Sequence, residues 1–125
     1  MKYDSLDAEN AVVGGLLIDP CCERVLATRL REEDFSNKKI GYIFRTIMNM
    51  HIDSKPIDIV TVRDFIENDY QPKDRTWMVT FEDLALVAEN STGTQNIESY
   101  CRHVRECRIK NEIENFKQGI NYDNY

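Results

Sequence analysis

The chain has 125 residues, of which 42% are hydrophobic and 30% are charged, and its formal net charge is −6. This length and composition predict one globular domain with a single hydrophobic core. No apolar run approaches the roughly 20 residues that a membrane-spanning helix needs, which excludes a membrane protein. The opening residues Met1–Asp4 lead into no apolar signal segment, which favours a cytoplasmic location. Acidic side chains outnumber basic ones by 22 to 16, so direct binding to nucleic acid is not expected, because neutralising phosphates requires clustered Lys and Arg.

The most apolar stretch, from Leu6 to Pro20, predicts the helix around which the chain is organised. Ser5 is placed to cap this helix, and the acids near its start, including Glu9, suit the positive end of the helix dipole. Gly14 and Gly15 are unexpected here, because each costs about 1 kcal/mol relative to alanine inside a helix. The pair therefore indicates that another backbone passes close by. The predicted apolar stripe comprises Leu6, Val13, Leu16 and Leu17.

A second helix is predicted from Pro20 to about Leu30. The strongest amphipathic signal of the chain comes after it. Phe35 is the lone apolar residue of the acidic turn in between, and we expect it in the core. Ser36 or Asn37 is predicted to cap the third helix. The apolar side of that helix comprises Ile40, Ile43, Phe44, Ile47 and Met48. Met48 and Met50 could line a partner groove, but filling the core is favoured because the stripe is continuous with the isoleucines.

The run from Pro56 to Val62 is rich in β-branched residues, and propensity alone would make it a strand. Asp58 is a good N-cap, however, and the apolar residues after it continue at helical spacing, so a helix is predicted. Residues 68–79 are predicted to form a loop, from which Trp77 either covers the core, the favoured alternative, or stands exposed as an interface anchor. Thr80 with Asp83 predicts a capping box for a fifth helix, whose buried face is expected to hold Phe81, Leu84, Ala85 and Ala88.

The last helix is predicted to be long, from Thr94 to about Gln118, with Gly119 and a polar tail ending it. Its first half should face the body of the domain through Ile97, Tyr100, Cys101 and Val104. The register then shifts to a second stripe: Ile109, Ile113, Phe116 and Ile120. We expect this stripe to contact a partner helix, unless it folds back onto the head. The predicted fold is all-α and one domain: a compact five- to six-helix head over residues 1–93, followed by one long C-terminal helix and tail over residues 94–125.

Two segments resemble the N-terminal domain of DnaB-type replicative DNA helicases. The segment 8–19 reads Ala-Glu-Asn-Ala-Val-Val-Gly-Gly-Leu-Leu-Ile-Asp, and the segment 56–62 reads Pro-Ile-Asp-Ile-Val-Thr-Val. Three weaker matches follow the family order, so the resemblance covers roughly residues 5 to 117; they are Glu32-Glu33-Asp34-Phe35, Ile43-Phe44 and Val104-Arg105-Glu106. The chain departs from the family where Met78-Val79 replaces a usual Gly-Gly pair and where Gly93 lies in a loop that lacks the family's proline.

The resemblance implies a non-catalytic collar domain that assembles the helicase ring and docks primase or a helicase loader in DNA replication. It also implies self-association as a dimer or higher oligomer, with the long helix as the first arm of a helical hairpin. ATP and Mg²⁺ would bind only in a separate motor domain, so no cofactor is expected in this chain. A second hypothesis is a free-standing phage or mobile-element homologue that binds the host helicase or primase and inhibits or redirects it.

The sequence offers no recognisable catalytic or metal-binding residues. The phosphate-binding pattern Gly-x4-Gly-Lys-Ser/Thr is missing, and the two histidines suggest no nucleophilic triad. Cys101, His103 and Cys107 match no usual zinc spacing, and all four cysteines are expected to be reduced thiols. The basic cluster Arg102, Arg105, Arg108 and Lys110 is interrupted by glutamates, which favours a solvated helix face. A small enzyme remains a third hypothesis, which zinc binding or turnover would support.

Overall fold

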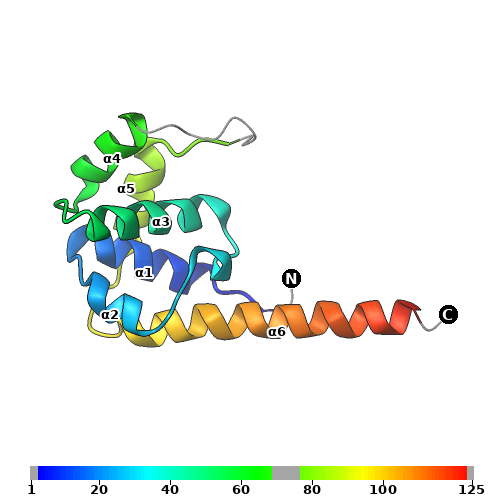
Figure 1. The fold of residues 1–125 in the computed structure, drawn as a ribbon. Coiled ribbons are helices and arrows are strands. Elements are labelled where there is room, and N and C mark those ends of the chain that lie inside the picture. The colour runs from blue at the N-terminus through cyan, green and yellow to red at the C-terminus, as the bar shows by residue number, and fades with distance from the viewer. Residues whose placement is uncertain (1–2, 69–76, 124–125) are drawn as a thin grey trace.

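The computed structural model describes residues 3–68 and 77–123, with side chains described as far as Gly119. These residues form six α-helices, one 3-10 turn and no strand, which confirms the predicted all-α fold. The elements are α1 (Leu6–Ile18), α2 (Cys22–Ala27), η1 (Glu32–Asp34), α3 (Lys38–Ile52), α4 (Ile59–Asn68), α5 (Phe81–Glu89) and α6 (Ile97–Asp123). Figure 1 shows a head built from α1 to α5 and the long helix α6, which runs under the head and projects beyond it.

Helix α1 is the centre of the head, as its composition predicts. It packs against α3, α5 and α6 (Figure 1), and Val12, Val13 and Leu16 are fully buried. Leu6 does not belong to the buried stripe as predicted: it is 40% exposed at the first turn, where α1 extends past its neighbours. The buried surface of α1 covers most of its circumference, because three helices pack on it from different sides.

Gly14 and Gly15 allow the close approach that their presence predicts. A Cβ atom built on Gly14 would lie 2.4 Å from the carbonyl oxygen of Val87 in α5, a distance at which the two backbones would have to separate. A Cβ on Gly15 would lie 3.1 Å from Cγ2 of Thr94, just before α6. The glycine pair therefore lets α1 contact the segments on both sides of the 90–96 loop.

Helix α3 is the second large contributor to the hydrophobic core. All five residues of its predicted stripe are buried, and so is Met50, which confirms that the methionines fill the core. Phe35 is also buried as predicted, with its ring 4.9 Å from that of Phe44. Thr46, by contrast, is buried although it lies on the helix side that was expected to be solvated. Its hydroxyl donates to the Tyr42 carbonyl at 2.9 Å, which satisfies the polar group.

Three predicted helix caps are present. The Asn37 side chain accepts from the Ile40 amide at 3.0 Å, and the Asp58 carboxylate accepts from the Thr61 amide at 2.8 Å. Thr80 and Asp83 form the reciprocal capping box that opens α5. Each cap satisfies an amide that the first turn of a helix leaves without a backbone partner.

Ser5 does not cap α1, because its hydroxyl donates to the Glu9 carboxylate at 2.5 Å. Glu9 is completely buried, and it also accepts from the Ser36 hydroxyl at 2.6 Å and from the Asn37 amide at 3.0 Å. The two donors at Ser36 and Asn37 tie α1 to the turn that opens α3. Glu9 is therefore a structural carboxylate, and the prediction that it serves only the helix dipole misses this role.

Three element boundaries differ from the predictions. Helix α2 ends at Ala27 instead of near Leu30, because Arg29 adopts a left-handed backbone with φ 63°. Helix α6 begins at Ile97 instead of Thr94 and continues through Gly119 to Asp123. One glycine costs a helix only about 1 kcal/mol, so the flanking residues carry the helix past it.

Two smaller predictions concern the loop and the face of α5. The loop prediction for residues 69–76 lies outside the described residues, but Trp77 is half-buried and its ring meets Tyr42 edge-on at 6.0 Å. This contact confirms that Trp77 covers the core. Phe81 is 44% exposed, and Val87 instead packs into the core beside Leu84, because the buried face of α5 is rotated away from its first residue.

Candidate functional site

Helix α6 forms an arm that leaves the head partway along its length. With 27 residues it is about 40 Å long at the usual rise of an α-helix. Ile97, Cys101 and Val104 are fully buried against the head, as predicted. Among the side chains described up to Gly119, Cys107 is the last buried one of α6, one turn further on. The C-terminal part of α6 extends past the head in Figure 1.

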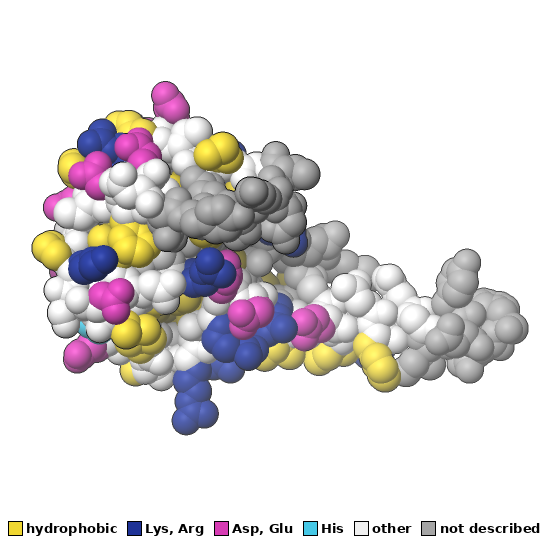
Figure 2. Space-filling view, turned by 45° about the horizontal axis from the view of Figure 1, so that its top comes forward, with side chains coloured by type: hydrophobic (Ala, Val, Ile, Leu, Met, Phe, Trp, Pro, Cys, Tyr) yellow, Lys and Arg dark blue, Asp and Glu magenta, His cyan; other side chains and the backbone are white. Residues whose placement is uncertain are grey.

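The second apolar stripe lies on the projecting part of the arm. Ile109, Ile113 and Phe116 are 45%, 48% and 68% exposed, so they do not fold back onto the head. Their spacing of four and then three residues puts them on one helix face. Figure 2 shows hydrophobic side chains in a row along one edge of the arm. Ile120, the fourth predicted member, lies in α6, but its side chain is outside the described ones.

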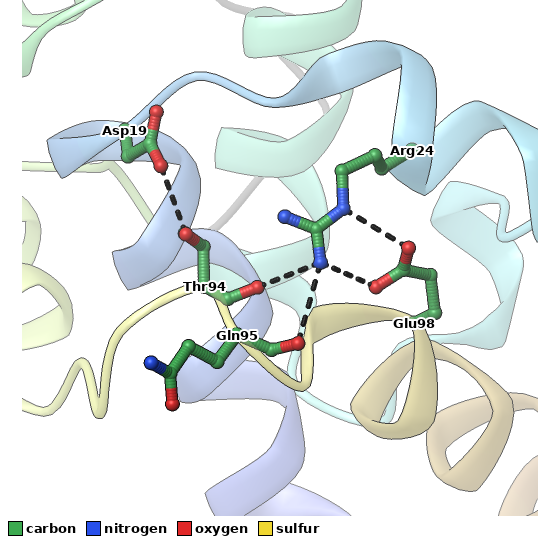
Figure 3. A network of polar contacts seen from close by, with 5 residues as sticks. All are labelled: Asp19, Arg24, Thr94, Gln95 and Glu98. Carbon is green, nitrogen blue, oxygen red and sulfur yellow. Dashed lines mark hydrogen bonds and ion pairs between the residues drawn. The ribbon is translucent and has the colours of Figure 1, made fainter.

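A polar clamp fixes the start of α6 to the head (Figure 3). The Arg24 guanidinium of α2 donates to both carboxylate oxygens of Glu98, at 3.0 and 2.6 Å, and to the Thr94 carbonyl at 2.9 Å. The Thr94 hydroxyl donates to the Asp19 carboxylate at 2.8 Å, just after α1. Arg24 thereby joins α2 to the start of α6 through its guanidinium group. The Thr94 hydroxyl joins the same segment to the end of α1.

The clamp makes part of the free energy of unfolding depend on pH. Hydrogen bonds from Arg24 lower the pKa of Glu98 from 4.5 to about 2. A lowered pKa contributes stability above the ordinary value, and this contribution is lost as the pH falls from about 4.5 through about 2. We expect the difference in free energy of unfolding between the wild type and Glu98→Gln to shrink over that interval. Urea unfolding at several pH values measures it, and a difference that stays constant down to about pH 2 would contradict the assignment.

Two further contacts support the arm where it leaves the head. Arg108 donates to the buried carboxylate of Asp34 at 3.0 Å and pairs with Glu112 at 3.0 Å. The Asn111 side-chain amide exchanges two hydrogen bonds of 3.0 Å with the backbone of Tyr3. The N-terminal segment and η1 therefore hold α6 beyond the point at which its apolar contacts end.

The basic cluster of α6 is only partly the solvated face that the sequence indicates. Arg105 donates to the Thr28 carbonyl at 2.9 Å, Arg108 binds Asp34, and the Lys110 ammonium lies 5.5 Å from the Tyr3 ring centre. Arg102 is exposed. The first three side chains attach the arm to segments more than 70 residues away in sequence, which charge patterning along one helix cannot reveal.

The described residues hold no group of three His, Cys, Asp or Glu side chains that could bind a metal. His103 and Cys107 approach each other, with Nε2 3.5 Å from Sγ, but no further ligand joins them among these residues. Burial raises the pKa of Cys22 and of Cys101 to about 11, so these thiols are poor nucleophiles. None of the described helices is both long and apolar enough to cross a membrane.

The fold and the arm define the class: an all-α domain whose most distinctive surface is a projecting helix with an exposed apolar face. Residues 1–106 match the family model of the DnaB-like helicase N-terminal domain, and the chain belongs to this family. The match ends just before the apolar stripe of the arm.

Curated relatives agree with this assignment. The chain is 30% identical over 109 residues to the replicative DNA helicase DnaB of Pasteurella multocida, and 30% identical over 110 residues to that of Buchnera aphidicola. These alignments cover 87% and 88% of this chain but only 23% of each relative. The chain therefore spans less than a quarter of the length of these helicases.

Solved structures share the fold. The N-terminal domain of DnaB from Mycobacterium tuberculosis superposes with a TM-score of 0.74 and 22% identity, over 98% of this chain and 87% of that one. The corresponding domain from Helicobacter pylori, whose structure is described together with its interactions with primase, gives a TM-score of 0.72 and 22% identity over 95% and 90% of the two chains. The arrangement of helices in this chain is thus that of DnaB N-terminal domains.

Proposed function

We propose that this chain is a non-catalytic assembly and docking domain of a replicative DNA helicase, and that it associates with further copies through the α6 arm. The observation that carries the proposal is the exposed row of Ile109, Ile113 and Phe116 on a helix that is anchored to its head. Apolar side chains at this spacing suit packing against a second helix. The rest of the described chain provides no helix that covers them.

The size of the stripe sets the expected strength of association. Fully burying a large apolar side chain contributes about 1.5–3 kcal/mol, and Ile109 and Ile113 are already about half covered, whereas Phe116 is mostly exposed. Association itself costs about 4–15 kcal/mol in lost translational and rotational freedom. Three residues on one arm therefore support weak self-association, which becomes visible only at high protein concentration.

Substituting charged residues on the arm tests this interface. We expect Ile113→Glu with Phe116→Glu to abolish concentration-dependent association in sedimentation velocity, because two carboxylates would be buried without partners. Helicity and the thermal midpoint should stay at wild-type values, because both side chains are exposed in the monomer.

The matched control is Leu86→Glu, which places a charge on an exposed apolar residue of the head, 59% exposed in α5. This variant should associate like the wild type. A wild-type chain that stays monomeric at millimolar concentration would refute the interface. Loss of the cooperative melt in the arm variant would show instead that the stripe belongs to the core.

Docking of primase or a helicase loader is the second part of the proposal. Support comes from the shared fold with the H. pylori domain, which interacts with primase. Purified primase from the same cell should bind the chain in a calorimetric titration. Absence of binding would contradict the proposed docking of primase. ATP and Mg²⁺ would act in a separate motor domain, in the cytoplasm, where replication takes place.

The alternative of a free-standing homologue that binds the host helicase or primase uses the same exposed stripe. An immunoblot of the source cells separates the two, because the parent helicase would be several times heavier than the 14.7 kDa of this chain. A native product near that mass would favour a small inhibitor or adaptor.

A further inference from the structure

A shallow basin of about 670 Å³ lies between the end of α2 and the first turns of α6. Its charged lining comprises four arginines and two glutamates: Arg24, Arg29, Arg102, Arg105, Glu23 and Glu98. In a chain with a net charge of −6, this local excess of arginine is unusual.

Two of the four arginines are held in place by the protein itself. Arg24 is bound to Glu98 and to the Thr94 carbonyl, and Arg105 donates to the Thr28 carbonyl. These contacts form a fixed rim for the basin. The guanidinium groups of Arg29 and Arg102 are exposed, and within the described residues they make no hydrogen bond or ion pair.

The backbone conformation of Arg29 is unusual for a residue that has a side chain. It follows the C-cap Thr28 with φ 63°, the left-handed position that glycine usually occupies after a helix. A residue with a Cβ costs roughly 1–2 kcal/mol in this conformation. Ser54 adopts the same conformation after α3, so the strain alone assigns no use to a side chain, but at Arg29 the side chain is a guanidinium that lines the basin.

We propose that this basin binds a carboxylate-rich segment of a protein partner, with Arg29 and Arg102 as the groups that contact it. The planar guanidinium matches a carboxylate in a two-bond geometry, and two such groups beside a fixed rim can bind successive acidic side chains. The phosphates of a nucleic-acid strand would compete for the same guanidinium groups, so the test below includes such a strand. The basin lies at the base of the arm, so this site does not depend on self-association through the α6 stripe.

The test is a titration of the full chain with a fluorescent octapeptide of alternating Asp and Glu, followed by anisotropy and by the NMR signals of the arginine side chains. Saturable binding that shifts Arg29 and Arg102 is expected. The double variant Arg29→Gln, Arg102→Gln should weaken binding by about tenfold or more, the equivalent of one charge-assisted contact. The control double variant Arg31→Gln, Arg63→Gln removes the same charge from exposed or half-exposed positions outside the basin and should bind like the wild type.

The single variant Arg29→Gly separates binding from folding. Glycine relieves the left-handed strain, so the thermal midpoint should stay equal or rise while peptide affinity falls. The arm variant Ile113→Glu, Phe116→Glu should bind the peptide normally, which distinguishes this site from the proposed interface. The inference is overturned if no saturable binding occurs, if the control variant weakens binding equally, or if an eight-nucleotide thymidine strand binds the same residues more tightly than the peptide.

Discussion

Replacing Glu9 by alanine is expected to lower the free energy of unfolding by about 3–5 kcal/mol, a large share of the 5–15 kcal/mol that stabilises a typical domain. The substitution removes an acceptor that is completely buried and that receives three hydrogen bonds, from Ser5, Ser36 and the Asn37 amide. Hydrogen bonds to a charged group contribute about 1.5–3 kcal/mol each, and the donors left behind lie partly out of reach of water. Urea unfolding followed by circular dichroism measures the loss.

Two comparisons make this prediction specific to the buried network. Glu67→Ala in α4 removes an exposed carboxylate and should change stability by no more than about 0.5 kcal/mol. Glu9→Gln keeps the shape and one acceptor oxygen, so its loss should fall between those of the other two variants. If Glu9→Ala lost less than about 1 kcal/mol, the network would not hold α1 to the start of α3.

Gly14→Ala is expected to destabilise the protein by about 2 kcal/mol, although alanine is the better helix former. The added methyl group would meet the Val87 carbonyl oxygen at 2.4 Å, so α1 and α5 must move apart. Overpacking of this kind costs about 1–3 kcal/mol, and more when the obstacle is backbone, while the gain in helix propensity returns only about 1 kcal/mol. The thermal midpoint and the urea midpoint should both fall.

The other helical glycines of α1 and α6 provide graded controls. Gly119→Ala meets nothing within 4 Å and should stabilise α6 by up to about 1 kcal/mol. Gly15→Ala meets the Thr94 methyl group at 3.1 Å, which can move, so its effect should lie between the two. Equal stabilisation by all three substitutions would show that no close helix approach exists at Gly14.

Local patterns predicted most of the fold because local physics determines them. The stripe of α3 and the caps at Asn37, Asp58 and Thr80 depend on residues within one or two turns, and all are observed. The helix at 59–68 also shows the value of a cap signal, which outweighs the β-branched composition there.

Long-range polar pairs could not be predicted in the same way. Glu9 looks like an ordinary N-terminal acid, and only the folded chain brings Ser36 and Asn37 to it from 27 and 28 residues away. Asp34 and Arg108 meet across 74 residues. Nothing in one sequence selects these partners among 22 acidic and 16 basic side chains.

The candidate interface was predictable because the apolar period shifts along α6. The exposure of Ile109, Ile113 and Phe116 agrees with that shift, whereas their role in association stays a prediction. The burial of Cys107 agrees with the expectation that the thiols are at least partly buried, but the predicted first stripe stops at Val104, because one cysteine gives a weak hydrophobic signal. The left-handed conformation of Arg29 could not be predicted from the sequence either, because it is visible only in the folded backbone.

The way α6 is attached makes the projecting part of the helix a lever. Beyond Cys107, polar contacts to Asp34 and to the Tyr3 backbone support the helix, and the tip at Asp123 lies about 24 Å further along the axis. A tilt of about 5° at this fulcrum displaces the tip by about 2 Å, since displacement grows with the length of the helix. Loss of either polar support, at Arg108 or at Asn111, therefore acts on the direction of the arm before it acts on the head.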